Sequence, residues 1–399
     1  MKTRREFLVS AGGIALGAAV APSALAGLSG AAKGKRMKIL ILGGTGFLGP
    51  HIVNRAVENG HAVTLFNRGR TGPDLFPDLE HIEGDRYTDL SGLEKAVADG
   101  RRWDAVIDTF TYVPKTVTDA MDVLMPAMGR FVVISTISVY ASNAEPGMDE
   151  KAPVATMDDA TADGITTHRE VGVHYGAMKA RVEAAAEARM PGKVCVIRPG
   201  LIVGPRDTTG RYSYWPVRGS EGGTMIAPGT GADHVQIVDV RDLGDFTVRC
   251  VEDGRTGLYN ALSPAGKWTM RDIVDAAVRT GEAGTAPEWV DAGFLSEHGV
   301  NAWQQMPAWI PASRPEYAGI GRMSTARAIA AGLTTRTLED TNRATLAYYR
   351  DRQAELRAER GDEFGDQWAK DIRGGISPEK EAEVLAAWRA QGAGGPGAG

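Results

Sequence analysis

The sequence predicts an α/β protein built on a doubly wound parallel sheet, with a smaller C-terminal lobe. Two observations predict the sheet: short apolar runs of buried-strand length alternate with helix-like intervals, and a glycine-rich turn directly follows the first run. A third observation predicts the lobe, because this alternation is lost after Gly200. The length of 399 residues is enough for one large domain or two modest ones.

The first unit of the pattern is a strand, a turn and a helix. Residues 38–42 form an apolar run, the turn begins at Gly43, and apolar residues then recur at helical spacing until Gly60, which is placed as a helix C-cap. The strand signal returns at residues 61–66, 104–108, 131–134 and 194–197. Strands that alternate with helical segments favour a parallel sheet with helices on both faces, the Rossmann arrangement.

The second half of the chain is less regular. Residues 236–238 indicate a strand that returns to the sheet, and Asp242 could cap the helix that follows. A capping box at residues 337–340 predicts a helix through Tyr349, and Pro378 begins a short terminal helix. We therefore expect a sheet domain at residues 36–203, a lobe at 204–350 with returning sheet elements at about 236–262, a helical extension at 351–390 and a disordered tail at 391–399.

The first 26 residues have the parts of a secretory signal in order. Basic residues precede an apolar stretch from about Phe7 to Val20, and Ala24-Leu25-Ala26 follows as a cleavage site. The stretch is too short to favour a stable membrane span. The pair Arg4-Arg5 resembles the twin-arginine signal, which predicts export of the folded protein to the periplasm or beyond, with residues 27–35 as a linker. An uncleaved signal that anchors the chain, or a disordered basic tail, are the alternatives.

Charge, cysteine and histidine usage argue against several function classes. The formal net charge is −5 and no strongly basic stretch follows the first few residues, so a nucleic-acid partner is not expected. Cys195 and Cys250 cannot make a disulfide framework and are interpreted as buried free thiols. The seven histidines lack metal-ligand spacing, so no metal site is predicted.

Residues 43–49 read G-x-x-G-x-x-G between a predicted strand and a predicted helix. Glycine permits the tight turn and brings backbone N–H groups close to a pyrophosphate, which also faces the positive end of the helix dipole. This context predicts a dinucleotide site. Its expected cofactor contacts are Gly43, Thr45, Gly46, Phe47, Leu48 and Gly49.

The end of the second strand bears on which dinucleotide binds. NAD sites place an acidic residue there for the ribose 2′-hydroxyl, whereas this chain has Asn67 and Arg68, followed by Arg70. Guanidinium groups match a 2′-phosphate better, so the sequence favours NADP, with NAD as the alternative. Asp85, after the third strand, is expected to contact adenine or to serve as a turn residue.

Tyr175 and Lys179 are four residues apart, on one face of a helix. A phenol with a pKa of about 10 is a poor base at neutral pH. A neighbouring ammonium and the positive nicotinamide ring would lower that pKa, so that the phenol could exchange a proton with a hydroxyl or carbonyl. Residues 135–140, Ser-Thr-Ile-Ser-Val-Tyr, follow a predicted strand and offer a hydroxyl for the same substrate oxygen.

Together these motifs resemble a known family, the extended short-chain dehydrogenases/reductases, and within it the NAD-dependent epimerase/dehydratase branch. The resemblance runs from about residue 37 to 349 and includes Arg198-Pro199-Gly200, followed by Gly204-Pro205. It implies that Tyr175 is the acid/base. It also implies that Lys179 lowers the pKa of this phenol and binds the nicotinamide ribose, and that Thr136 steadies the substrate oxygen, with Ser135 and Ser138 as alternatives.

The chain departs from the family in two respects. Sugar-nucleotide dehydratases carry an acidic pair directly after the catalytic threonine, whereas this chain has Ile137-Ser138, so water elimination is doubtful. Most relatives also lack an export signal. Because no free NADPH pool is expected outside the cytoplasm, we expect a tightly held cofactor that is reduced and reoxidised within one catalytic cycle.

The sequence therefore predicts an NAD(P)-dependent epimerase or oxidoreductase that acts on a hydroxyl or carbonyl carbon of a sugar-like or other small polar substrate. The expected substrate contacts are Tyr212, Trp215 and Arg218, although aromatic residues in this stretch could equally be lobe core. The export machinery is a further expected partner, and the resemblance allows a homodimer. A non-catalytic NAD(P)-binding sensor or scaffold on the same fold is the alternative function.

Overall fold

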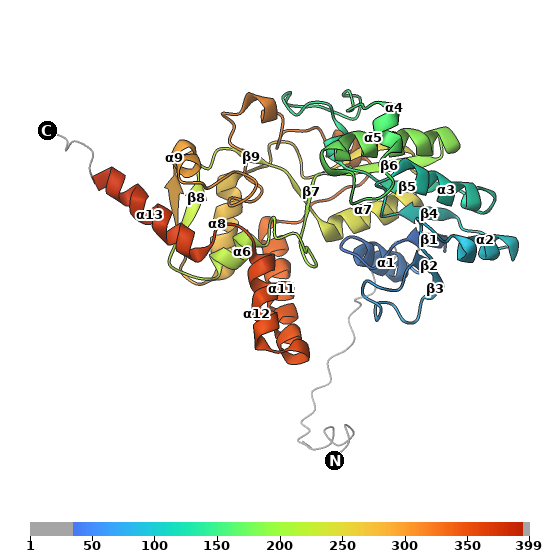
Figure 1. Ribbon diagram of the computed structural model, residues 1–399, viewed down its shortest axis with the longest axis horizontal. Helices are drawn as coiled ribbons and strands as arrows, with labels where there is room; N and C mark the ends of the chain where they lie inside the picture. The colour runs from blue at the N-terminus through green and yellow to red at the C-terminus, as the bar shows by residue number, and fades with distance from the viewer. Residues whose placement is uncertain (1–34, 394–399) are drawn as a thin grey trace, which may run out of the picture. The chain divides into compact units, whose positions relative to one another are not determined.

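A computed structural model describes residues 35–393. Within these residues seven strands form one parallel sheet, in the order β3-β2-β1-β4-β5-β6-β11 (Figure 1). The strands are β1 (Lys38–Leu42), β2 (Ala62–Asn67), β3 (Glu80–Glu83), β4 (Ala105–Asp108), β5 (Phe131–Ile134), β6 (Val194–Pro199) and β11 (Gly257–Ala261). The strand order runs outward from β1 in both directions, so a topological switch point lies between β1 and β4, where such sheets bind ligands.

The alternation of side chains along each strand assigns them to two hydrophobic layers. Ile39 and Ile41 of β1 face one layer, formed with α1 (Gly49–Glu58) and α7 (Val240–Glu252). Leu40 and Leu42 face the other, formed with α3 (Pro114–Leu124) and α5 (Tyr175–Arg189), and α2 (Ser91–Ala98) lies at its edge. Because both faces are covered, the central strands are apolar and buried, as in β5 and in residues 39–42 of β1, and the doubly wound fold is confirmed.

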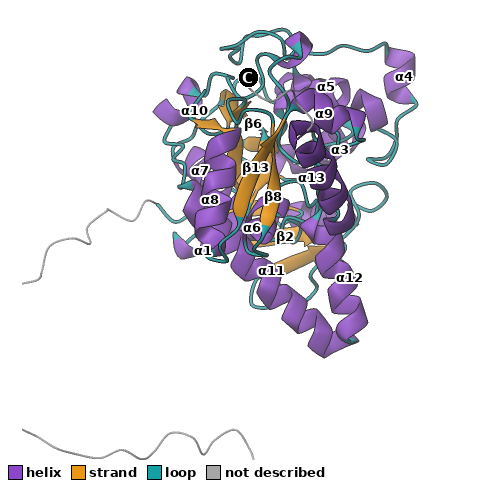
Figure 2. Ribbon diagram, turned by 90° about the vertical axis from the view of Figure 1, so that its left-hand side faces the viewer, coloured by secondary structure: helices purple, strands orange, loops and turns teal. Residues whose placement is uncertain are grey.

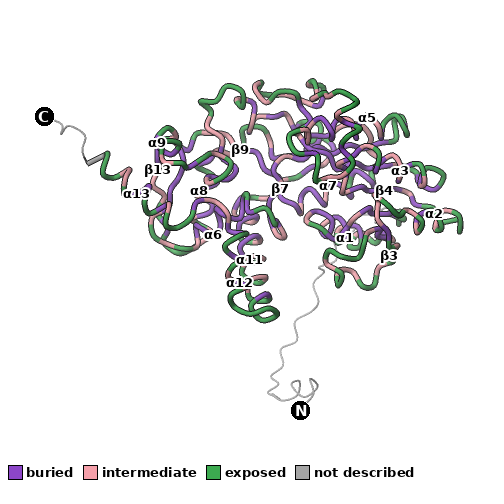
Figure 3. Tube along the Cα trace, viewed as in Figure 1, coloured by how far each residue is buried: buried purple, intermediate pink, exposed green. Residues whose placement is uncertain are grey.

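The second half of the chain forms a lobe with its own core around a parallel strand pair, β8 and β13 (Figure 2). Its main elements are α6 (Tyr214–Gly219), β8 (Thr224–Pro228), α8 (Met270–Gly281), β13 (Ala286–Val290), α9 (Ala292–Glu297), α11 (Leu338–Arg360), α12 (Asp362–Arg373) and α13 (Pro378–Ala393). Strand β8 and α6 are largely buried and β13 is partly buried, whereas the far end of the α11–α12 hairpin is exposed (Figure 3).

Shorter elements lie between these strands and helices. They are α4 (Asp159–Asp163), β7 (Leu201–Val203), β9 (His234–Val235), β10 (Ile237–Asp239), β12 (Trp268–Thr269), α10 (Ala326–Ala330) and four 3-10 turns: η1 (Met125–Ala127), η2 (Ile137–Val139), η3 (Gly172–His174) and η4 (Pro315–Tyr317). The strand expected at residues 236–238 forms as β10 but does not return to the main sheet, because it pairs with β7 in a two-stranded sheet. The elements that do return are α7, which packs on the sheet, and β11, which pairs with β6 at its edge.

Four further details differ from the sequence-based expectation. Asp239, not Asp242, caps α7, because its side chain accepts a hydrogen bond from the backbone N–H of Arg241. The helix predicted to end at Tyr349 continues to Arg360, across the expected boundary at residue 350. Helix α13 reaches Ala393, so residues 391–393 are helical rather than part of a disordered tail. Pro378 does begin this helix, which at 16 residues is not short.

The predicted signal at residues 1–26 and most of the predicted linker at 27–35 lie outside the described residues. Among residues 35–393, no helix has the length and apolar character needed to cross a membrane. Cys195 and Cys250 are buried free thiols, as expected.

Candidate active site

The glycine turn between β1 and α1 has a shape that only glycine allows. Gly43 and Gly44 have φ angles of +107° and +90°, which L side chains rarely adopt. A Cβ atom at Gly49 would lie 2.5 Å from the carbonyl carbon of Gly44, so the helix could not begin this close to the turn with any larger residue. The first turn of α1 therefore presents its backbone N–H groups beside the turn, as a pyrophosphate site requires.

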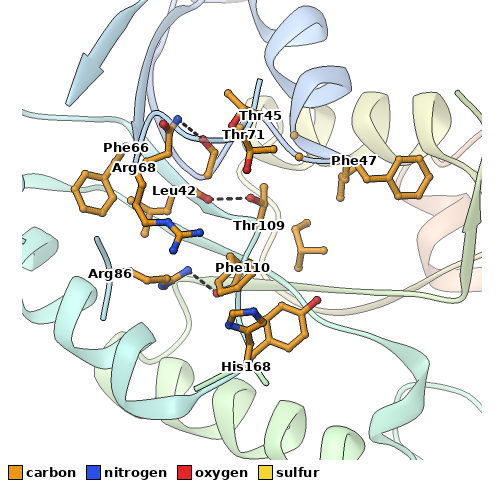
Figure 4. A pocket seen from close by; sticks show the side chains of 18 of the residues that line it. Leu42, Thr45, Phe47, Phe66, Arg68, Thr71, Arg86, Thr109, Phe110 and His168 are labelled. Atoms are coloured by element: carbon orange, nitrogen blue, oxygen red, sulfur yellow. Dashed lines mark hydrogen bonds between the residues drawn. The ribbon is translucent and has the colours of Figure 1, made fainter. Parts of the chain in front are cut away.

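A pocket of about 420 Å³ opens over this turn, within the range of roughly 300–1,000 Å³ that is usual for ligand sites. Its lining comes from the turn, from the carboxyl ends of β2, β3 and β4, from the start of α5 and from one residue of the segment before α5 (Figure 4). These side chains include Phe66, Asn67, Arg68, Arg70, Asp85, Arg86, Tyr87, Phe110, Tyr112, His168, Tyr175 and Lys179. The six expected contacts of the glycine turn also line it. Shape and lining together fit an extended dinucleotide.

One end of the pocket collects charged groups. Arg68 is about half exposed, and its Nη1 atom lies 3.8 Å from Oδ2 of Asp85. Asp85 also accepts a hydrogen bond from the backbone N–H of Tyr87, so it serves as a turn residue as well as a lining residue. Asn67 donates to the carbonyl oxygen of Gly43 at 2.9 Å and thereby ties β2 to the glycine turn. Because β2 and β3 end here, this is the adenosine end in proteins of this topology.

The other end holds Tyr175, the first residue of α5. Burial, with a smaller contribution from Tyr112, raises the pKa of Tyr175 to about 12, while a hydrogen bond with Thr136 and the charge of Arg211 act in the opposite direction. We expected a lowered pKa. Desolvation of the phenolate outweighs the groups that favour it, and Lys179, expected to lower this pKa, is not among those groups.

Lys179 lies one helical turn further on and is only 3% exposed. Its ammonium donates to Oγ1 of Thr111 at 2.5 Å and to the carbonyl oxygen of Ile134 at 2.6 Å. Burial lowers the pKa of Lys179 to about 7, although Asp108 and Glu183 favour the charged form. The ammonium also lies 5.5 Å from the centre of the Tyr112 ring. Lys179 is thus held at the pocket wall by β4 and β5 rather than by a carboxylate.

The three candidate hydroxyls have different surroundings. Thr136 caps η2 by accepting a hydrogen bond from the backbone N–H of Ser138 at 3.1 Å, and its hydroxyl is the one beside Tyr175. Ser135 instead donates to Glu183, a buried carboxylate that forms an ion pair with Arg198 at 2.6 Å. Of the three, Ser135 lines the pocket, whereas Thr136 is the one that forms a hydrogen bond with Tyr175.

The expected substrate contacts do not lie at this pocket. Tyr212 and Trp215 are fully buried in the lobe core, where Tyr212 donates to Asn342 and the Trp215 indole donates to the carbonyl oxygen of Pro307. Arg218 is buried and paired with Glu381. The prediction that these three residues bind substrate is therefore wrong, and the lobe-core interpretation holds. The reason is that α6 packs against α8 and α11, which sequence periodicity in so short a helix could not reveal.

Several pocket residues were not predicted. Arg86 and the fully buried Asp108 form a two-point ion pair, with both nitrogen–oxygen distances 2.6 Å, and Arg86 also donates to the carbonyl oxygen of Phe110. Phe110 and Tyr112 follow β4, so the rule that ligands bind at the carboxyl ends of strands could have indicated them. His168 had no such signal, because it lies in an irregular segment far along the chain.

Comparisons with known proteins show the family of the chain. The family model described as NAD dependent epimerase/dehydratase family matches residues 39–261. The chain is 25% identical over 254 residues to the epimerase family protein SDR39U1 of Bos taurus, covering 60% of this chain and 79% of that protein. It is 29% identical over 190 residues to a 2-alkyl-3-oxoalkanoate reductase of Stenotrophomonas maltophilia, covering 43% and 52%.

A solved structure shares the fold. The Bordetella bronchiseptica enzyme WbmH, in complex with NAD+, aligns with a TM-score of 0.56 and 21% identity over 79% of this chain and 99% of that one. The family model spans more than half of the chain, from the first strand of the sheet to its last. The chain therefore belongs to the NAD-dependent epimerase/dehydratase family.

Proposed function

We propose that this protein is an NAD(P)-dependent epimerase or oxidoreductase that acts on a hydroxyl or carbonyl carbon of a sugar-like or other small polar substrate. The observation that carries the proposal is the position of Tyr175 in the pocket. Tyr175 lies at one end of the pocket, with Thr136 beside it and Lys179 one helical turn away. A glycine turn of the dinucleotide-binding type lines the same pocket. Membership of the family and similarity to an epimerase family protein and a reductase support the same class of reaction.

Each of the three side chains has a distinct role in this proposal. A bound nicotinamide cofactor supplies the hydride chemistry at the substrate carbon. Tyr175 accepts a proton from a substrate hydroxyl, or donates one to a substrate carbonyl oxygen, and the Thr136 hydroxyl holds that same oxygen in place. Lys179 binds the nicotinamide ribose and, in its protonated form, stabilises the phenolate form of Tyr175, because an opposite charge close by favours ionisation. Ile137 and Ser138 supply no acidic pair after Thr136, so we do not propose water elimination.

We further propose that the cofactor is NADP, held tightly throughout the catalytic cycle. Arg68 and Arg70 line the adenosine end, and no acidic residue ends β2. Two guanidinium groups there suit a 2′-phosphate, although Asp85 offsets part of the charge of Arg68. NAD remains the alternative, since WbmH binds it on the same fold.

The predicted signal supports export through the twin-arginine route, and a protein that crosses the membrane folded can carry its cofactor with it. For the substrate, we propose a molecule with an anionic group, since Arg211 is exposed and its charge acts on both Tyr112 and Tyr175. Homodimer formation stays a proposal that rests on the family resemblance.

The first test identifies the cofactor. The full chain is expressed with its own signal, the exported form is purified and denatured, and the released nucleotide is identified by mass spectrometry. We expect NADP(H) in nearly one-to-one ratio with protein. If the released nucleotide is NAD(H), Arg68 does not bind a 2′-phosphate, while the proposed reaction at Tyr175 is unaffected. Protein that holds no nucleotide, and gains no thermal stability with either, would contradict the retained cofactor.

The second test separates an enzyme from a sensor or scaffold. Tyr175→Phe removes only a hydroxyl, so cofactor binding should stay the same. In a screen of sugars and sugar acids, the rate at which the bound cofactor is reduced should fall by orders of magnitude. Tyr317→Phe, in the exposed η4 turn, is the matched control. If Tyr175→Phe leaves every substrate-dependent signal intact, the non-catalytic alternative is favoured.

A further inference from the structure

The segment before α5 makes a detour over the cofactor pocket. Residues 158–174, here called the covering segment, begin with Asp158, which caps α4 by accepting the backbone N–H of Thr161 at 2.8 Å. Ile165 and Val171 are buried in a small cluster with Val113 of the β4–α3 loop and Met178 of α5. The segment is thus fixed at two points, and residues 166–170 form a compact bend between them.

The bend has its own internal support. The Glu170 carboxylate accepts hydrogen bonds from the backbone N–H groups of Thr166 at 2.8 Å and Thr167 at 3.0 Å. This arrangement presents His168 to the pocket, where it is a lining residue together with Arg68, Arg86 and Tyr87. Figure 4 shows the imidazole beside the ring of Phe110, on the side of the pocket where Arg86 and Arg68 lie.

Tyr87, which follows β3, connects this bend to the sheet domain. Its hydroxyl oxygen accepts a hydrogen bond from the backbone N–H of His168 at 3.0 Å and lies 3.2 Å from Nδ1 of the same residue. We assign Nδ1 as the acceptor of the phenolic proton, which places the proton of the neutral ring on Nε2. Burial lowers the pKa of His168, which also favours the neutral form.

Aromatic rings surround this contact. The imidazole lies 5.0 Å from Phe110, 6.0 Å from Tyr112 and 6.1 Å from Tyr87, measured between ring centres. These are distances at which aromatic side chains stabilise one another. The cluster spans the adenosine end of the pocket and continues to Tyr175, whose ring lies 6.0 Å from Tyr112.

We propose that His168 is a cofactor-retaining residue: held by Tyr87 and packed on Phe110, it covers the adenine of the bound dinucleotide and slows its release. The inference rests on the proposed cofactor site and names the part of the chain that keeps the cofactor in place. In this proposal, the hydrogen bonds and ring contacts of His168 with Tyr87 and Phe110 must break before the adenosine end can leave. The proton on Nε2 gives the cover a donor for the nucleotide.

The test measures release directly. The purified full chain is loaded with NADPH, or with NADH, and mixed rapidly with an excess of the oxidised form, while the fluorescence of the bound reduced cofactor is followed. His168→Ala removes the ring, and Tyr87→Phe removes only the hydroxyl that holds it. Val173→Ala is the control, because Val173 is in the same segment, is 96% exposed and does not line the pocket.

We expect both site variants to release the cofactor roughly tenfold faster than wild type, since each loses contacts of the size of one aromatic pair or hydrogen bond. Val173→Ala should release it at the wild-type rate. If His168→Ala and Tyr87→Phe both bind the cofactor and release it at the wild-type rate, the proposal that His168 retains the cofactor is wrong, while the proposed cofactor site is still supported. If the wild-type protein binds neither NADPH nor NADH, both the cover and the proposed function are wrong.

Discussion

Arg218 and Glu381 form a buried ion pair, with Nε of Arg218 2.7 Å from a carboxylate oxygen of Glu381. The other oxygen of Glu381 accepts the backbone N–H of Ile226, and Arg218 donates to the carbonyl oxygens of Gly222 and Thr224. The pair therefore connects α6, β8 and α13, which are far apart in the sequence. It makes the terminal helix part of the lobe rather than an appendage.

We expect Glu381→Ala to lower the free energy of unfolding by about 3–5 kcal/mol, because the variant leaves the Arg218 charge buried without a partner. Urea denaturation followed by circular dichroism measures the change. The control is Arg389→Ala, also on α13, which breaks a more exposed pair with Glu288 and should cost no more than about 1 kcal/mol. Equal losses for the two variants would mean that the buried pair does not hold α13 to the lobe.

The sheet and the glycine turn could be predicted from sequence because their signals are local. Apolar runs such as residues 38–42 are long enough to identify a buried strand, and glycines in a strand–helix context leave few alternatives. The positions of Tyr175 and Lys179 follow from helix geometry in the same way. Family membership is confirmed over these elements.

The lobe and the pocket cover could not be predicted because they depend on contacts between distant residues. Trp215 and Arg218 occur in a stretch of aromatic and basic residues that is typical of both a binding surface and a core, and only packing against α8, α11 and α13 distinguishes them. His168 meets Tyr87 across 81 residues in an irregular segment. The raised pKa of Tyr175 likewise results from burial, which sequence spacing does not report.

Arg68 should determine how well the protein distinguishes NADP from NAD. A hydrogen bond to a charged group contributes about 1.5–3 kcal/mol, so we expect Arg68→Gln to weaken NADP+ binding roughly tenfold or more. NAD+ binding should change little, because it lacks the 2′-phosphate. Asp85→Asn should strengthen NADP+ binding, since it removes the carboxylate 3.8 Å from the guanidinium.

Isothermal titration calorimetry with each nucleotide tests this prediction. Arg189→Gln, an exposed arginine paired with Asp122, controls for the loss of one positive charge elsewhere on the molecule. An equal loss of NADP+ and NAD+ affinity in Arg68→Gln would show that Arg68 does not bind the 2′-phosphate of the ribose.

Lys179 should make stability depend on pH. Burial lowers its pKa from 10.5 to about 7, so between these pH values the unfolded chain carries a proton that the folded chain has released. The free energy of unfolding should therefore rise with pH across this window, and this contribution should be lost as pH falls to 7. In Lys179→Met the rise should be smaller, whereas exposed Lys115→Met should keep the wild-type slope.

Urea denaturation at several pH values within the window measures the slope. The raised pKa of Tyr175, about 12, acts only above the ordinary phenol value of 10.0, so it does not disturb most of the window. If wild type and Lys179→Met give the same slope, Lys179 is not held in the environment described above.

His168 should make cofactor release depend on pH. Nδ1 can accept the Tyr87 hydroxyl proton only while the imidazole is neutral, because protonation turns Nδ1 into a donor and removes this acceptor. Burial and the nearby charges of Arg169 and Arg68 lower the pKa of His168 below its ordinary value of 6.5. The closed cover is therefore fully present above pH 6.5 and is lost as pH falls through the lowered pKa.

NADH is the sharper probe for this effect, because the 2′-phosphate of NADPH would itself attract a protonated imidazole and oppose the opening. We expect the release of NADH from wild type to become faster below pH 6.5, while release from His168→Ala and Tyr87→Phe is already fast and nearly independent of pH. Stopped-flow displacement by NAD+ measures all three. If the same acceleration persists in His168→Ala, another group titrates and the neutral imidazole does not hold the cover closed.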